Sequence, residues 1–183
     1  MDNIRIQGYK SFKDLSVQLH PINLLIGANG AGKSNFLSLF EMLGNIYEKR
    51  LGAYVAQVGG VDKLLYQGRK VTECIRVDFG IGKADYLLSL MESDGRLIVE
   101  KEQIGETIGE VKHVMELCSY KNEAILKDNI DSQNGEFLKS YISQIRKFHF
   151  HDTGRRSPFT ADSHIVNDAY RMYEHGENLA AIL

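Results

Sequence analysis

The sequence predicts an α/β protein in which a mixed sheet surrounds one helix and continues into an antiparallel β-meander. An apolar run at residues 21–26 leads into a glycine-rich turn and then into apolar residues at helical spacing. Residues 1–20 and 72–103 instead alternate apolar and polar side chains, as strands with one buried face do. The final "ENLAAIL" begins an apolar helical face that is not continued, so we expect an incomplete domain.

The first 26 residues predict three strands. Ile4 and Ile6 alternate with polar residues before an expected turn at Gly8, and the stretch "LSVQLH" alternates in the same way, so these two strands should be antiparallel. The stretch "INLLI", residues 22–26, is almost wholly apolar. That composition favours a strand covered on both faces, at the centre of an α/β sheet.

A helix is expected from Ser34 onward. Its apolar stripe runs through Phe36, Leu39/Phe40, Leu43 and Ile46/Tyr47, which is the spacing of one helix face. Glycines at 52, 59 and 60 then interrupt the pattern. We therefore assign residues 1–50 to a core around this helix.

The central part of the chain predicts the meander. Ile75, Val77 and Phe79 share one strand face, and Asp94-Gly95 between two apolar runs indicates a hairpin. The stretch 104–128 is ambiguous, although "EVKHVMELCSY" could be a further strand. We assign 51–128 to the meander and 129–183 to a helix, a short strand at "FHFH" and another helix.

The composition is that of an ordinary soluble domain. The 183 residues suit one domain, with 43% apolar and 25% charged residues and a net charge of -2. This balance gives no global attraction to nucleic acid. No signal peptide and no membrane span are evident, so we expect a cytoplasmic protein that does not bind membranes. Cys74 and Cys118 lie in strand-like surroundings, where buried reduced thiols are expected.

The glycine-rich turn carries the clearest chemistry. "GANGAGKS" fits the phosphate-loop pattern G-x-x-x-x-G-K-[ST], in which small residues let backbone N–H groups converge on an anion. The next helix adds its N-terminal donors, Lys33 a cation, and Ser34 a hydroxyl ligand for Mg²⁺. The sequence thus predicts a site for ATP and Mg²⁺ made of Gly27, Ala28, Asn29, Gly30, Ala31, Gly32, Lys33, Ser34 and Asn35.

The N-terminal residues also resemble a known group of proteins. The stretch "IQGYKSFKDLSVQLHPINLLIGANGAGKSNFLSLFEML" is similar to the start of RecF-like and SMC-like ABC-type ATPases, and most similar to bacterial predicted ATPases described as AAA. The later "FHFHDT" and "GENLAAIL" resemble segments of the same predicted ATPases. Such proteins are often linked to mobile elements, phage defence or DNA repair.

The resemblance implies a partner and further site residues. ATP would lie between two heads, and each head would offer its phosphate loop to one ATP and a serine-glycine signature to the other. Lys10, Ser11 and Phe12 would lie at the adenine and ribose side of the nucleotide, and an ordinary turn is the alternative. His151 or Asp152 would lie near the γ-phosphate and Mg²⁺, although a metal site of His149, His151 and Asp152 or a solvated loop are alternatives.

Two motifs of that family are not evident in this sequence. We find neither a convincing apolar run ending in Asp-Glu nor a serine-glycine signature, so the catalytic carboxylate remains unassigned. Since phosphoryl transfer depends on positioned water and charge stabilisation, the chain alone should bind ATP and hydrolyse it poorly. Hydrolysis would need a second head or a C-terminal half, and the complete system could act on DNA or with a nuclease.

Two other functions are compatible with the phosphate loop. A self-contained small kinase would need an acceptor site and an arginine-rich lid, and the two antiparallel N-terminal strands argue against it. A non-catalytic module would use nucleotide only to order a surface that binds a partner.

Overall fold

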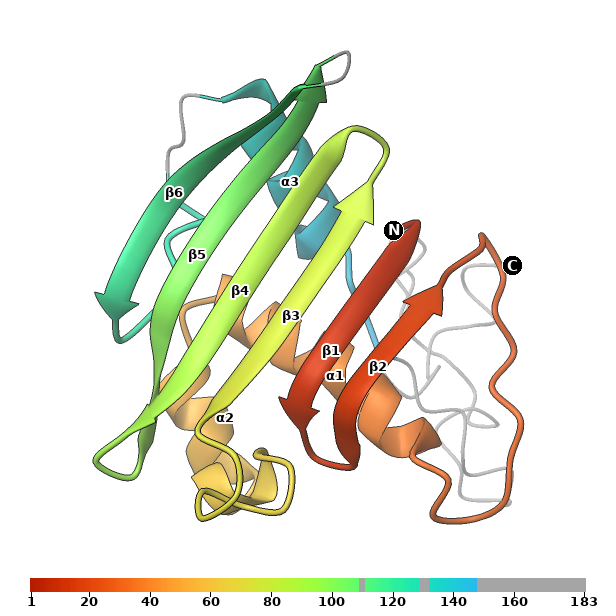
Figure 1. Ribbon diagram of the computed structural model, residues 1–183, viewed down its shortest axis with the longest axis vertical. Helices are drawn as coiled ribbons and strands as arrows, with labels where there is room; N and C mark the ends of the chain where they lie inside the picture. Colours follow the sequence, from red (N-terminus) through yellow and green to blue (C-terminus); the bar gives the residue numbers. More distant parts are fainter. Residues whose placement is uncertain (109–110, 129–131, 148–183) are drawn as a thin grey trace, which may run out of the picture. The chain divides into compact units, whose positions relative to one another are not determined.

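A computed structural model describes residues 1–108, 111–128 and 132–147. Residues 1–145 form one compact unit, in which six antiparallel strands make a single sheet in the order β2-β1-β3-β4-β5-β6 (Figure 1). The elements of this unit, in chain order, are β1 (Asn3–Tyr9), β2 (Phe12–Gln18), α1 (Lys33–Tyr47), α2 (Leu51–Gln57), the 3₁₀ turn η1 (Val61–Lys63), β3 (Cys74–Ile81), β4 (Ala84–Ser93), β5 (Arg96–Ile108), β6 (Val111–Lys121) and α3 (Gln133–Ser143).

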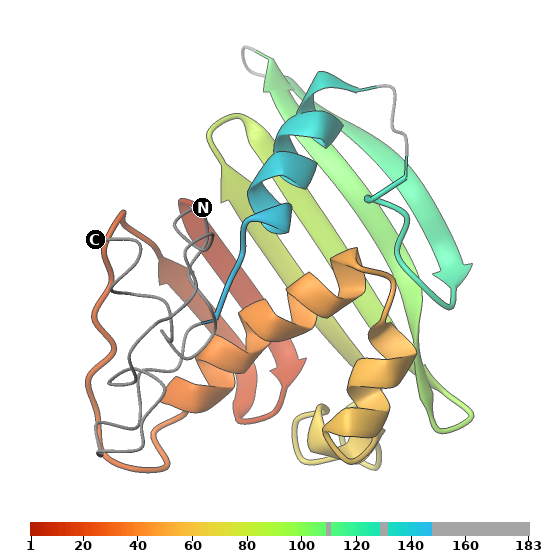
Figure 2. The ribbon, with the colours of Figure 1, turned by 180° about the vertical axis from the view of Figure 1, so that it is seen from behind.

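Only one face of the sheet is covered by helices in this unit. Figure 2 shows α1, α2 and α3 on the same face, with α1 crossing it obliquely. The alternating side chains explain this arrangement, because Ile4, Ile6, Val77 and Phe79 point to the helical face and are fully buried. Polar neighbours such as Arg5 occupy the opposite face, as is usual for antiparallel sheets.

The hairpins follow local backbone chemistry. Asp94 and Gly95, with φ of 50° and 78°, connect β4 and β5, as the sequence predicts. The first hairpin turns at Lys10 and Ser11, so the predicted turn at Gly8 was wrong. Gly8 lies inside β1, where a Cβ atom would stand 2.2 Å from the carbonyl oxygen of Cys74. The close approach of the Cys74 backbone therefore explains why this position is a glycine.

The predicted strand at residues 22–26 was wrong. These residues adopt no strand. The side chains of Ile22, Leu24 and Ile26 are 90%, 81% and 83% exposed. An extended segment becomes a strand only when a neighbour satisfies its backbone groups, and no described strand pairs with this segment. Residues 22–26 are therefore apolar but not buried within this unit.

The expectation of a mixed sheet was also wrong for the described residues. Every strand pair in the six-stranded sheet is antiparallel, and β1 pairs with both β2 and β3. The first hairpin and the meander therefore belong to one sheet. The α/β class is confirmed, with an antiparallel sheet in place of the mixed one.

The two helices predicted within the described residues are confirmed, with one correction. The apolar stripe of α1 is buried at Phe36, Leu39, Leu43 and Ile46, and α3 overlaps the helix predicted after residue 129. After α1 ends at Tyr47, a second helix, α2, includes the glycine at position 52 that was expected to interrupt the pattern. The meander consequently begins at β3, not at residue 51, and β6 shows that the ambiguous stretch contains a strand.

Three predictions lie outside the described part of this fold. The strand predicted at "FHFH", the helix predicted at "SHIVNDAYRMYEHG" and the final "ENLAAIL" all lie outside the described residues. Among the residues that are described, no helix has the length and apolar character needed to cross a membrane.

The two cysteines differ in environment. Cys118 is buried as expected, whereas Cys74 is exposed, which corrects the prediction for that residue. Cys74 begins β3 and belongs to the face of the sheet opposite the helices, because its neighbour Ile75 points into the core. Burial, reinforced by the negative charge of Glu102, raises the pKa of the Cys118 thiol to about 12.

This difference predicts selective labelling. At pH 8 only about 1 in 10,000 Cys118 side chains would be thiolate, the reactive form, and Cys118 is also shielded from reagent. Iodoacetamide should therefore add one group per folded chain, at Cys74, as measured by intact mass and peptide mapping. The Cys74→Ser variant should remain unlabelled until denatured, and rapid labelling of that folded variant would contradict the environment described for Cys118.

Candidate functional site

The glycine-rich turn is shaped by two left-handed glycines. Gly30 and Gly32 have φ of 84° and 93°, values that other residues rarely adopt. Gly32 is also the N-cap of α1 and accepts a hydrogen bond from the Phe36 amide at 2.9 Å. A Cβ atom at Gly32 would approach Ser11 Oγ and the Phe12 ring at 3.2 Å. The sequence therefore needs glycine here for both conformation and space.

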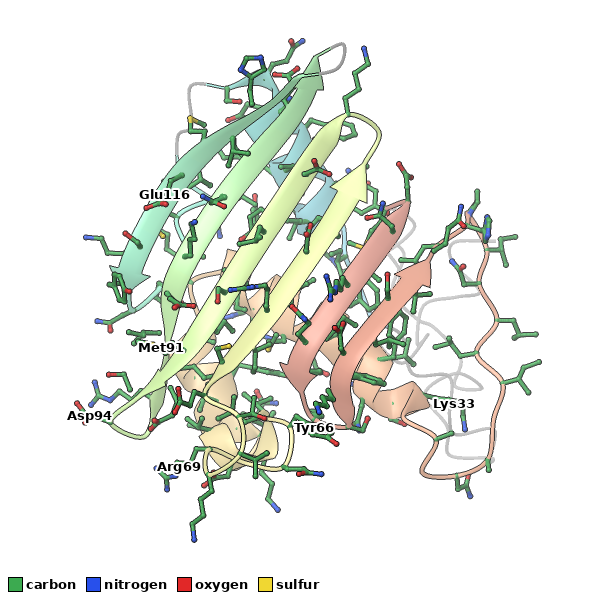
Figure 3. All side chains as sticks on the ribbon, viewed as in Figure 1. Lys33, Tyr66, Arg69, Met91, Asp94 and Glu116 are labelled. Atoms are coloured by element: carbon green, nitrogen blue, oxygen red, sulfur yellow. The ribbon has the colours of Figure 1, made fainter. Side chains whose placement is uncertain are left out.

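Lys33 is the first residue of α1 and lies beside this turn (Figure 3). Its ammonium donates hydrogen bonds to the carbonyl oxygens of Gly27 and Ala28, at 2.6 and 2.8 Å. Both acceptors belong to exposed residues of the same loop. Phosphate oxygens are charged and form stronger hydrogen bonds with an ammonium than carbonyls do, so a polyphosphate could replace these contacts.

Most of the other loop residues are exposed, among them Asn29, Ala31 and Ser34. The Ala31 amide donates to the Ala28 carbonyl at 3.2 Å, so an anion would have to replace this contact to bind that amide. Mg²⁺ on a nucleotide takes most of its ligands from phosphate and water, and one hydroxyl such as that of Ser34 fits this chemistry. The described residues contain no cluster of three acidic, histidine or cysteine side chains placed for a metal. Asp152, with His149 and His151, lies outside the described residues.

The fold brings three predicted site residues together from distant positions in the sequence. Asn35 Nδ2, in the first turn of α1, donates to Ser11 Oγ of the β1–β2 turn at 2.9 Å. The Lys10 ammonium donates to Ser38 Oγ, one turn further along α1, at 2.8 Å. Lys10, Ser11 and Asn35 therefore form one cluster beside the glycine-rich turn.

This cluster borders an open pocket of about 900 Å³. The opposite wall is the segment 58–70, which sequence reasoning did not select. The side chains that line the pocket are rich in cations and amides, and include Lys10, Ser11, Asn35, Lys63, Gln67 and Lys70. The size is within the range usual for small-molecule sites. A signal was present in the sequence, because "GGVDKLLYQGRK" combines three glycines with three basic residues.

The segment 58–70 is fixed to the β1–β2 turn by its backbone. The Lys10 amide donates to the Leu64 carbonyl at 2.7 Å, and the Tyr66 amide donates to the Gly8 carbonyl at 2.9 Å. Within the segment, Asp62 accepts a hydrogen bond from the Arg69 amide at 2.9 Å. Figure 3 shows Tyr66 and Arg69 on this segment. The pocket wall is thus held by main-chain contacts.

Comparison with known families identifies the chain. A family model described as the AAA ATPase domain matches residues 1–177, nearly the whole sequence. The chain belongs to the AAA ATPase domain family. A search of curated proteins gives no significant match.

Membership of the AAA ATPase domain family gives the loop and pocket a context. Proteins with this domain bind ATP, typically with Mg²⁺, so the family agrees with the nucleotide expected from "GANGAGKS". The residue assignments at the loop and at Lys10 and Ser11 stay predictions. They rest on the geometry described above and on the chemistry of phosphate recognition.

Proposed function

We propose that the chain is the ATP-binding portion of a RecF-like or SMC-like ATPase. One observation carries the proposal: a glycine turn with Lys33 at its end adjoins a pocket of about 900 Å³ lined by Lys10, Ser11 and Asn35. In a member of the AAA ATPase domain family, this arrangement suits a nucleoside triphosphate.

The two parts of the site would receive different parts of the nucleotide. The backbone N–H groups of residues 27–34 and the Lys33 ammonium would hold the β- and γ-phosphates. The pocket would take the base and ribose, with Ser11 and Asn35 as hydrogen-bonding groups. Mg²⁺, when bound with ATP beside the Ser34 hydroxyl, would neutralise negative charge on the phosphates.

We also propose that hydrolysis requires further polypeptide, supplied by a second head or a C-terminal half. Among the described residues, the Lys33 ammonium forms hydrogen bonds with two carbonyl oxygens and with no carboxylate. The exposed Ile22, Leu24 and Ile26, directly before the loop, support a partner that packs against this region. DNA repair, mobile-element or phage-defence systems are the settings that the resemblance suggests.

A concentration series of ATP hydrolysis tests this proposal. The purified chain should bind ATP but release little phosphate at low concentration. Its initial rate should rise with the square of protein concentration if two heads form the site, or rise only when the candidate C-terminal half is added. A rate that is linear in protein concentration, with phosphate passed to a small acceptor, would instead identify a kinase. ATP binding with no turnover under any of these conditions would identify a non-catalytic module.

A further inference from the structure

We propose that Ser38 is a positioning residue, which holds the Lys10 ammonium where the pocket adjoins the glycine-rich turn, so that Lys10 meets a phosphate oxygen of the bound nucleotide and not the adenine or ribose that the resemblance implies for it. The inference rests on the proposed ATP site and goes beyond it, since Ser38 does not line the pocket. Ser38 is only 9% exposed and lies one helical turn after Ser34 on α1.

The hydroxyl of Ser38 has all of its hydrogen-bonding capacity in use. It donates to the Asn35 carbonyl at 2.8 Å, and it accepts from the Lys10 ammonium at 2.8 Å. Tyr9 Oη lies 2.9 Å away on a third side. A hydroxyl has one proton and two lone pairs, so Tyr9 must be the donor in this contact. The three partners leave the hydroxyl no alternative orientation.

Two tyrosines, Tyr9 and Tyr54, also contact Ser38. Burial raises the pKa of Tyr9 far above its usual value of 10, and burial also raises the pKa of Tyr54. Both phenols therefore stay protonated at physiological pH and act as donors. Tyr54 Oη donates to the Ser38 carbonyl at 3.3 Å, which ties α2 to the same point of α1.

Lys10 is held by its backbone and its side chain together. Its φ of 46° is a left-handed conformation that costs energy for a residue other than glycine, and its amide is bonded to the Leu64 carbonyl. Its ammonium also lies 5.4 Å from the centre of the Tyr9 ring. Ser38 belongs to α1, the helix that begins with Lys33, so its hydrogen bond fixes the position of Lys10 relative to that helix. Two cations are thereby placed relative to one helix, as a ligand with several phosphates requires.

A double-mutant cycle tests this role by calorimetry. The full chain would be compared with Ser38→Ala, Lys10→Met and the double variant, with ATP and adenosine as the two ligands. We expect Ser38→Ala to weaken ATP binding about 5- to 10-fold, because it releases a charged group from its partner. The affinity for adenosine, which has no phosphate, should change less than about twofold in the same variant. In the Lys10→Met background, Ser38→Ala should weaken ATP binding by less than about a further twofold, because the effects of coupled residues are non-additive.

Two further variants separate positioning from folding. Ser38→Thr keeps a hydroxyl and should recover most of the ATP affinity. Ser38→Cys nearly preserves volume but offers a weak acceptor, so it should behave like Ser38→Ala even if the alanine variant is unstable. Thermal melts would confirm that each variant is folded at the temperature of the titration.

The outcomes distinguish this inference from the proposed function. A wild-type chain that does not bind ATP would overturn the proposed function itself. A wild-type chain that binds ATP, with Ser38→Ala unchanged or with its full loss persisting in Lys10→Met, would overturn only the positioning role. Equal losses for ATP and adenosine would also overturn it, because they would indicate a general distortion of the pocket.

Discussion

Replacement of Lys33 by alanine should abolish ATP binding or weaken it by at least about 100-fold, which corresponds to ~3 kcal/mol. The ammonium would form charge-assisted hydrogen bonds with the outer phosphates, and alanine offers no donor in its place. Its present partners are two carbonyls of exposed loop residues, so the loss should not disturb the core. Isothermal titration with ATP and Mg²⁺ measures the effect.

Lys13→Ala provides the matched control. Lys13 is an exposed lysine of β2, and no role in the site is predicted for it. Its replacement should leave ATP affinity within about twofold, because isolated surface charges contribute little. Both variants should unfold at the wild-type temperature. If Lys33→Ala retained wild-type affinity while folded, the assignment of the phosphate loop would be wrong.

The second large effect concerns stability and is expected at Glu102. This carboxylate is fully buried, and it accepts hydrogen bonds from Tyr86 Oη at 2.7 Å and Cys118 Sγ at 3.3 Å. It also accepts from the backbone amides of Ile125 and Leu126, at 2.7 and 3.2 Å. Glu102 therefore fastens the segment after β6 to β5, the strand next to the sheet edge.

Glu102→Ala should lower the free energy of unfolding by about 3–5 kcal/mol, because it leaves several buried donors without an acceptor. Glu102→Gln preserves shape, yet its amide N–H₂ must face either Ile125 or Leu126, whose amides are also donors. We therefore expect a loss of about 2 kcal/mol for glutamine as well. Urea denaturation followed by circular dichroism measures both values.

Glu116→Gln is the control for this experiment. Glu116 lies on β6, and its side chain is 48% exposed, 4.0 Å from the Lys101 ammonium. A surface pair of this kind should change the unfolding free energy by less than about 0.5 kcal/mol. If Glu102→Gln were as mild as Glu116→Gln, the four contacts would not anchor the segment as described.

Local patterns in the sequence were enough to predict most elements of this unit. Alternation predicted β1, β2 and the meander, the Asp94-Gly95 pair predicted its hairpin, and helical spacing predicted α1 and α3. These predictions succeed because side-chain period and turn conformation depend on neighbouring residues. The same local reasoning placed Gly30, Gly32 and Lys33 in one loop at the start of a helix.

Other features depend on which segments meet in space, and the sequence alone did not reveal them. Residues 22–26 have the composition of a buried strand, but a strand also needs a neighbour, and none of the described strands pairs with them. The glycine at position 8 was taken for a turn because its contact with Cys74 is 66 positions away along the chain.

The division between the two sources of information has a physical basis. The sequence by itself predicted the phosphate loop, and it determined the period of each confirmed element and membership of the AAA ATPase domain family. Only the tertiary structure placed Lys10 against Ser38, made the segment 58–70 a wall of the pocket and buried Glu102 among four donors. Backbone conformation and side-chain period are local properties, whereas hydrogen bonds and burial between distant residues are decided when the whole sheet assembles.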